Sequence, residues 1–240
     1  LAGRGKGLVR LFAPEHGWSG TEPEGMQDAT EKATGLPVHS LYGPRRRPEP
    51  ESLQDLDVII VDLQDVGVRC YTYGVTAALL LRAFAALPGK QVLICDRANP
   101  LGAAVAGPRL DPGLRSFIGY FDLPFVHGQS LGAILRDWAG NALPDLRLDV
   151  VDAPEPLSPP AAWIPPSPSL GDWDAARLYP GLVLLEGTSL SEGRGTTHPF
   201  RAVLAPSLDG ARLAAEIAGW RHALRVNPVR ISPSRGKFAG

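Results

Sequence analysis

Five short apolar runs punctuate the chain and are separated by longer stretches of mixed polarity. They are rich in Val, Ile and Leu and lie near residues 8–12, 57–63, 91–95, 146–151 and 182–185. A short, continuous run of this composition is typical of a strand buried on both faces of a parallel sheet. The pattern therefore predicts an α/β protein built around such a sheet.

Helical patterns lie between these runs. Residues 76–87 are rich in Ala and Leu, and residues 130–139 begin with Ser130, a good helix-capping residue. The apolar residues of the second segment fall on one helical face: Leu131, Ile134, Leu135 and Trp138. Because strands joined through helices form right-handed crossovers, we expect a doubly wound, mainly parallel sheet with helices on both sides.

A proline-rich segment suggests a domain boundary. Residues 153–168 contain seven prolines, which neither a helix nor a central strand tolerates. We therefore predict one domain over residues 1–152 and a second, smaller α+β domain over residues 153–240. In this second domain we expect a strand at 182–185 and a helix over 208–220 that packs Leu213, Ile217 and Trp220 inward.

Composition narrows the class of protein. The 240 residues carry a net charge of −1, so nothing favours binding to nucleic acid or to an anionic membrane. No apolar segment approaches the ~20 residues that span a bilayer. The two cysteines, Cys70 and Cys95, lack ligand-like spacing, and we expect no metal or other cofactor. The abrupt start and end of the chain suggest a fragment cut at both ends.

Polar residues follow three of the predicted strands. They are Glu15 and His16 after the first, Asp62, Gln64 and Asp65 after the second, and Asp96, Arg97 and Asn99 after the third. Ligands of open α/β sheets bind outside the carboxyl ends of the strands, so these residues are expected to share one cleft. Each carboxylate taken singly would fit an Asx turn or a helix cap equally well.

Two further segments suit a sugar ligand. Arg69 could hold a carboxylate, and Tyr71 and Tyr73 could stack on a ring, although both tyrosines would also fit as caps on the core. The loop over residues 185–197 is polar and glycine-rich but lacks the spacing of a nucleotide-binding loop. We expect it to line the same cleft, with the alternative that Glu186 or Glu192 only anchors Arg194.

Several ordered motifs carry a family resemblance. They are Pro14-Glu15-His16-Gly17, the segment 62–67 with Tyr71-Thr72-Tyr73, Asp96-Arg97 with Asn99-Pro100, His127-Gly128, the segment 163–168, and residues 185–196. In this order they resemble the exo-β-N-acetylmuramidase (NamZ) family, glycoside hydrolase family 171. The resemblance implies an enzyme that removes terminal N-acetylmuramic acid from the non-reducing end of peptidoglycan fragments. It also implies a Rossmann-like catalytic domain over residues 1–152 and a partial C-terminal domain over residues 153–240 that completes the cleft. A location outside the cytoplasm, where the wall lies, is implied as well.

Glycoside hydrolysis needs an acid that protonates the leaving oxygen and a second carboxylate. We expect Glu15 to be the acid and His16 to hydrogen-bond either Glu15 or the sugar. The candidates for the second group are Asp62, Asp65, Asp96, Glu186 and Glu192. Arg69, Arg97 or Arg194 would bind the lactyl carboxylate. The resemblance extends substrate binding to Gln64, Tyr71, Tyr73, Asn99, His127 and Ser191.

Two other classes of protein stay open at this stage. One is a metal-dependent peptidoglycan amidase with His16, Asp62, Asp96 and His127 as ligands, although the chain lacks an H-x-x-x-H motif. The other is a non-catalytic module that binds wall sugars. In each case the expected partner is a muramyl saccharide from peptidoglycan, and the oligomeric state is left open.

Overall fold

The computed structural model describes residues 7–22, 27–152, 163–220 and 224–239. The chain divides into two compact units, residues 1–171 and residues 172–240, and each is described by itself. No helix of the described residues is long and apolar enough to cross a membrane.

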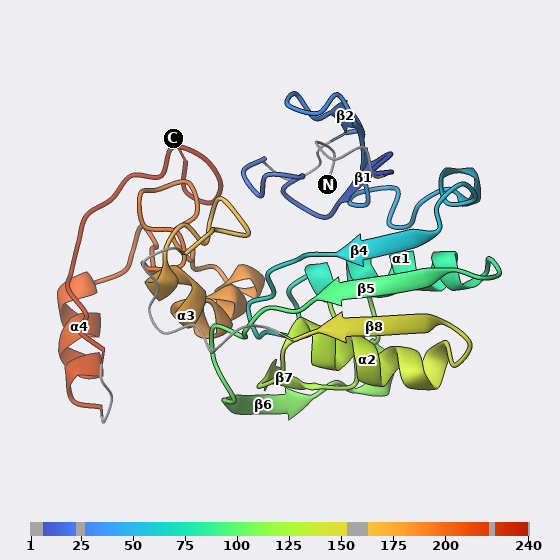
Figure 1. The fold of residues 1–240 in the computed structure, drawn as a ribbon. Coiled ribbons are helices and arrows are strands. Elements are labelled where there is room, and N and C mark those ends of the chain that lie inside the picture. Colours follow the sequence, from blue (N-terminus) through green and yellow to red (C-terminus); the bar gives the residue numbers. More distant parts are fainter. Residues whose placement is uncertain (1–6, 23–26, 153–162, 221–223, 240) are drawn as a thin grey trace. The chain divides into compact units, whose positions relative to one another are not determined.

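The first unit contains a three-stranded parallel sheet (Figure 1). Its order is β4 (Val58–Val61), β5 (Gln91–Cys95) and β8 (Arg147–Val151), with β5 in the middle. Helix α1 (Tyr73–Ala85) joins β4 to β5, and helix α2 (Leu131–Ala142) precedes β8. These elements match predicted ones to within a few residues, and the prediction of a mixed α/β fold with a parallel sheet is confirmed.

Both helices cover the same face of this sheet. Ile59 and Val61 of β4 and Val92 and Ile94 of β5 are buried in one core cluster with residues of α1 and α2, including Leu81, Phe84 and Leu135. On the opposite face Val58 and Ile60 are each 44% exposed. We expected helices on both faces. The strand order advances in one direction, so right-handed crossovers place α1 and α2 on one side.

Two smaller groups of strands complete the first unit. Strands β1 (Leu11–Ala13), β3 (Pro37–Ser40) and β2 (Ala29–Thr30) form a sheet in which β1 and β3 are parallel. Strands β6 (Val105–Arg109) and β7 (Pro124–His127) pair antiparallel. The short 3-10 helices η2 (Pro50–Ser52) and η3 (Pro112–Leu114) lie in the connections.

The second unit is helical where a strand was expected. Helix α3 (Trp173–Leu182) continues into the 3-10 helix η4 (Val183–Gly187), so the prediction of a strand at 182–185 is wrong. The side chain of Asp172 caps α3 by accepting a hydrogen bond from the Ala175 amide at 2.8 Å. Periodicity alone does not separate such a short apolar run from part of a helix.

Helix α4 (Gly210–Ala218) lies within the predicted segment but is shorter. Leu213 and Ile217 are half-buried, as expected of inward-facing residues. Trp220 lies beyond the end of the helix and is 66% exposed, so the prediction that it packs inward is wrong.

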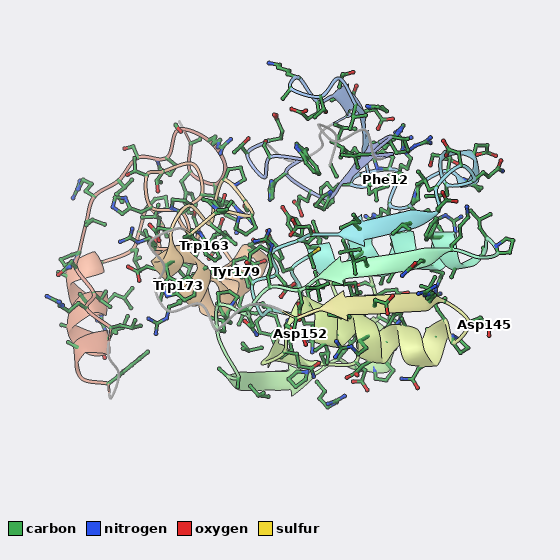
Figure 2. The ribbon with its side chains drawn as sticks, in the orientation of Figure 1. Phe12, Asp145, Asp152, Trp163, Trp173 and Tyr179 are labelled. Carbon is green, nitrogen blue, oxygen red and sulfur yellow. The ribbon has the colours of Figure 1, made fainter. Side chains whose placement is uncertain are left out.

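The boundary between the two units lies between residues 171 and 172, later in the sequence than the boundary that we predict at residue 153. Residues 163–171 belong to the first unit, where the Tyr71 and Tyr73 hydroxyls donate hydrogen bonds to the Pro166 carbonyl. The indole of Trp163, which is labelled in Figure 2, donates to the Leu170 carbonyl at 2.9 Å. Residues 153–162, which hold four of the seven prolines, lie outside the described residues.

The two faces of the parallel sheet predict unequal sensitivity to truncation. Ile59→Ala should lower the free energy of unfolding by about 2–5 kcal/mol, because the removed atoms leave a cavity in the core. Its neighbour Ile60 is the matched control, and Ile60→Ala should cost about 1 kcal/mol or less because that side chain faces away from the helices. Chemical denaturation measures both values, and equal losses would contradict the one-sided packing.

Candidate active site

Glu15 follows β1 in a tight turn that the Gly17 amide closes on the Pro14 carbonyl at 3.1 Å. Its side chain is 15% exposed. The Thr72 hydroxyl donates a hydrogen bond to Glu15 Oε2 at 2.9 Å, and the Tyr73 hydroxyl contacts the Glu15 main-chain carbonyl at 3.0 Å. The start of α1 therefore holds Glu15 by both its side chain and its backbone.

His16 adopts the left-handed backbone conformation, with φ of 71°. This conformation is uncommon for residues other than glycine and is often found at functional sites. Its Nδ1 lies 3.0 Å from the Glu22 carbonyl, which only accepts, so Nδ1 carries the hydrogen. In the neutral ring Nε2 is then an acceptor, and it lies 4.0 Å from Glu15 Oε1. Such a contact is longer than a hydrogen bond and is of the kind that tightens when substrate binds.

The two predicted tyrosines are buried next to Glu15, and Tyr73 contacts its main-chain carbonyl. Tyr71 and Tyr73 are both buried, with ring centroids 4.7 Å apart. Burial raises the pKa of Tyr73 to about 12, the hydrogen bond with Tyr71 opposes this shift, and the Glu15 charge adds to it. Tyr73 therefore keeps its proton and remains a donor. Their burial fits the alternative that they cap the core, and stacking on a sugar stays a prediction.

Asp65 and His127 form a buried pair beneath the loop that precedes α1. His127 Nε2 lies 3.4 Å from Asp65 Oδ1, and the two side chains are 2% and 8% exposed, respectively. The Gln129 amide donates to His127 Nδ1, so Nε2 carries the hydrogen that faces Asp65. Asp65 also accepts from the Gly67 amide at 2.7 Å. The pair fixes this loop, and contact of His127 with a sugar stays a prediction.

Asp96 is used as a cap for α2. Its Oδ1 accepts from the Gly132 amide at 2.7 Å, and its Oδ2 accepts from the Ser130 hydroxyl. A side chain at position 132 would collide with Asp96, since an added Cβ would lie 2.5 Å from its carboxyl carbon. The structural alternative considered for this carboxylate is therefore the one observed.

Asp62 and Arg97 form an exposed ion pair at the carboxyl ends of β4 and β5. Arg97 Nη2 lies 2.6 Å from Asp62 Oδ1, with the side chains 42% and 53% exposed, respectively. Next to them, the Gln64 amide donates to the Ala98 carbonyl and the Asn99 amide donates to the Gln129 carbonyl. Gln64 and Asn99 thus join neighbouring loops, while Asp62 and Arg97 face solvent.

Arg69 contacts other parts of the first unit through its guanidinium group. Its guanidinium donates to the Pro108 carbonyl at 2.9 Å and to the Leu123 carbonyl, and it lies beside the Phe125 ring. These contacts attach the loop before α1 to β6 and β7. They argue against a role for Arg69 in binding the lactyl group.

The predicted polar residues of the second unit form their own cluster. Arg194 lies 2.7 Å from Glu186 and 3.6 Å from Glu192, and its guanidinium stacks on the Phe200 ring. Glu192 is buried, and so is Ser191, whose hydroxyl accepts from the Gly193 amide. The contacts match the alternative in which the two glutamates anchor Arg194.

The ligand set considered for a metal-dependent amidase does not come together. Among the described residues no group of three or more His, Cys, Asp or Glu side chains is arranged to hold a metal ion. Instead, His127 pairs with Asp65, Asp62 with Arg97, and Asp96 with the start of α2.

Sequence reasoning missed Thr72, although it lies within one of the recognised motifs. Its signal was its position between two tyrosines directly before a helical pattern, where a hydroxyl residue is usually read as a cap. The direct contact with Glu15 depends on a tertiary arrangement that sequence spacing does not encode.

Family models match both parts of the chain. The model described as "Exo-beta-N-acetylmuramidase NamZ, N-terminal" matches residues 1–174, and its C-terminal counterpart matches residues 177–240. Peptidoglycan beta-N-acetylmuramidase NamZ of Bacillus subtilis (strain 168) is 36% identical to this chain over 218 residues. The match covers 86% of this chain and 52% of that protein, so the chain spans about half the length of this curated relative.

Two crystal structures of DUF1343 family proteins from Bacteroides fragilis NCTC 9343 are similar to this fold. One has a TM-score of 0.79 and 30% identity, and covers 97% of this chain and 62% of its own. The other has a TM-score of 0.70 and 36% identity, and covers 84% of this chain and 55% of its own.

The contacts of Asp96 predict a loss of stability when it is truncated. Asp96→Ala should lower the free energy of unfolding by about 1–2 kcal/mol, the range for loss of a helix-capping side chain. Asp145→Ala, an exposed aspartate after the same helix, is the matched control and should leave stability unchanged. Thermal or chemical denaturation gives both values. A stable Asp96→Ala protein would show that the cap contributes nothing measurable.

Proposed function

Because this chain belongs to the exo-β-N-acetylmuramidase NamZ family, we propose that it is a glycosidase that removes terminal N-acetylmuramic acid from the non-reducing end of peptidoglycan fragments. One observation within the chain carries the assignment of its acid. Glu15 lies at the end of β1 with its carboxylate held by Thr72 and its second oxygen facing an acceptor nitrogen of His16.

The proposed mechanism begins with proton donation by Glu15 to the glycosidic oxygen of the leaving sugar. The bond from the anomeric carbon to that oxygen breaks, and its electron pair stays with the leaving oxygen. A second carboxylate then attacks the anomeric carbon or activates water. His16 Nε2 orients the Glu15 oxygen that faces it.

Asp62 is our candidate for the second carboxylate in the first unit. It is 53% exposed at the carboxyl end of β4, whereas Asp65 is buried against His127 and Asp96 is bound to the start of α2. Asp62 is paired with Arg97, as Glu186 and Glu192 are with Arg194, so the choice of Asp62 rests on its place at the carboxyl end of a strand of the parallel sheet.

Arg97 is our candidate for binding the lactyl carboxylate. Its guanidinium is 42% exposed at the end of β5, and a planar guanidinium matches a carboxylate with two parallel hydrogen bonds. Arg69 is occupied by main-chain carbonyls, and Arg194 is neutralised by two glutamates. We further propose that the protein works outside the cytoplasm, because its substrate is a wall fragment.

Replacing Glu15 tests the function directly. Glu15→Gln removes the acid proton while preserving shape, and should lower the release of a chromogenic aglycone from an N-acetylmuramide by roughly several hundredfold. Glu22→Gln, in the same loop, makes the same chemical change and should leave the rate near that of wild type.

Three other outcomes separate the alternatives. Saccharide binding without release by the wild-type protein would overturn the enzyme in favour of a binding module. Loss of release after prolonged dialysis against EDTA would point to a metal-dependent hydrolase. Undiminished release by Glu15→Gln would show that Glu15 is not the acid.

A further inference from the structure

Thr72 occupies the capping position of α1 but makes no capping hydrogen bond. The helix begins at Tyr73, and the Thr72 side chain accepts no amide from the first turn. A capping threonine has an extended backbone, whereas Thr72 lies in the right-handed helical region, with φ of −81° and ψ of −7°. Its hydroxyl donates to Glu15 Oε2. The side chain at the start of α1 therefore contacts the Glu15 carboxylate and does not cap the helix.

We propose that Thr72 is a positioning residue that selects which oxygen of Glu15 delivers the proton, an inference that rests on the proposed glycosidase function. A hydrogen bond from Thr72 makes Oε2 an acceptor, so the acidic proton belongs on Oε1. Oε1 is also the oxygen that faces His16 Nε2, which accepts in the neutral ring. The Thr72 hydrogen bond is thus the contact that distinguishes the two oxygens, since His16 Nε2 lies 4.0 Å from Oε1.

The proton balance of the step follows from this arrangement. The Oε1–H bond breaks as a new O–H bond forms on the glycosidic oxygen, and the bond from that oxygen to the anomeric carbon breaks. Glu15 becomes a carboxylate, and the Thr72 hydrogen bond to Oε2 strengthens because its acceptor is now charged. The scissile oxygen must therefore approach Glu15 from the Oε1 side, next to His16.

The surroundings hold the Thr72 hydroxyl in place. Thr72 is buried, and its carbonyl accepts hydrogen bonds from the Thr76 amide at 3.0 Å and the Thr76 hydroxyl at 2.9 Å. The loop before it is fixed by the buried Asp65 and by the Arg69 guanidinium. Because Thr72 is already held in one conformation, little conformational entropy is lost when its hydroxyl orients the carboxylate.

Thr72→Val removes the hydroxyl with little change in volume, and it should lower kcat by roughly 10- to 100-fold, with KM changed by less than about threefold. Thr72→Ser restores the donor and should return kcat to within about fivefold of wild type. Thr76→Val is the matched comparison, because it removes a buried hydroxyl one turn away that contacts the Thr72 carbonyl and not Glu15, while the Thr76 amide keeps its own bond to that carbonyl. It should lower stability and change kcat by less than about threefold, well below the effect of Thr72→Val.

The outcomes distinguish this proposal from the function on which it rests. Release by wild type together with an unchanged kcat in Thr72→Val would overturn the role of Thr72 alone. Equal losses in Thr72→Val and Thr76→Val would show a general effect of packing at the start of α1. If wild type releases nothing, the proposed function fails. A crystal structure of Thr72→Val then decides the positioning role, since an unmoved Glu15 carboxylate would overturn it.

Discussion

The packing of α1 against the parallel sheet is the constraint from which the site geometry follows. Leu81 and Phe84 bury the helix against Ile59 and Ile94, and this contact fixes where its first residues lie. Those residues are Thr72 and Tyr73, which hold the side chain and the backbone of Glu15. The position of the proposed acid is therefore set by a hydrophobic interface more than by the turn that carries it.

Around this interface the polar residues divide into two groups. One group makes contacts that hold the scaffold: Asp65, His127 and Arg69 fix the loop before α1, and Asp96 caps α2. Asp62 and Arg97 remain exposed at the strand ends, where a ligand of an α/β sheet is expected. The scaffold thus uses charged and polar groups that resemble catalytic ones in sequence, and their hydrogen-bond partners separate the two kinds.

Sequence patterns predicted the parts of this molecule that depend on local periodicity. Strands β4, β5 and β8 and the Ser130 cap of α2 follow directly from apolar runs and capping chemistry, and the hydroxyl of Ser130 accepts from the Ala133 amide as expected. The run at 182–185 was misassigned because a short apolar run fits strand and helix equally well. The roles of Asp96 and Arg69 escaped prediction for another reason, since their partners lie about 36 and 54 residues away along the chain.

The surroundings of Glu15 depend on the Pro166 carbonyl, which lies far from Glu15 along the chain. It accepts hydrogen bonds from Tyr71 and Tyr73, both buried, and Tyr73 also contacts the backbone of Glu15. A fragment ended at residue 152 would lack this acceptor, and Tyr73 would keep its contacts with the Glu15 carbonyl and with Tyr71 but lose the one that holds both rings from the other side. The shortest piece that preserves the surroundings of Glu15 therefore extends through the segment around Pro166, well past the last strand of the sheet.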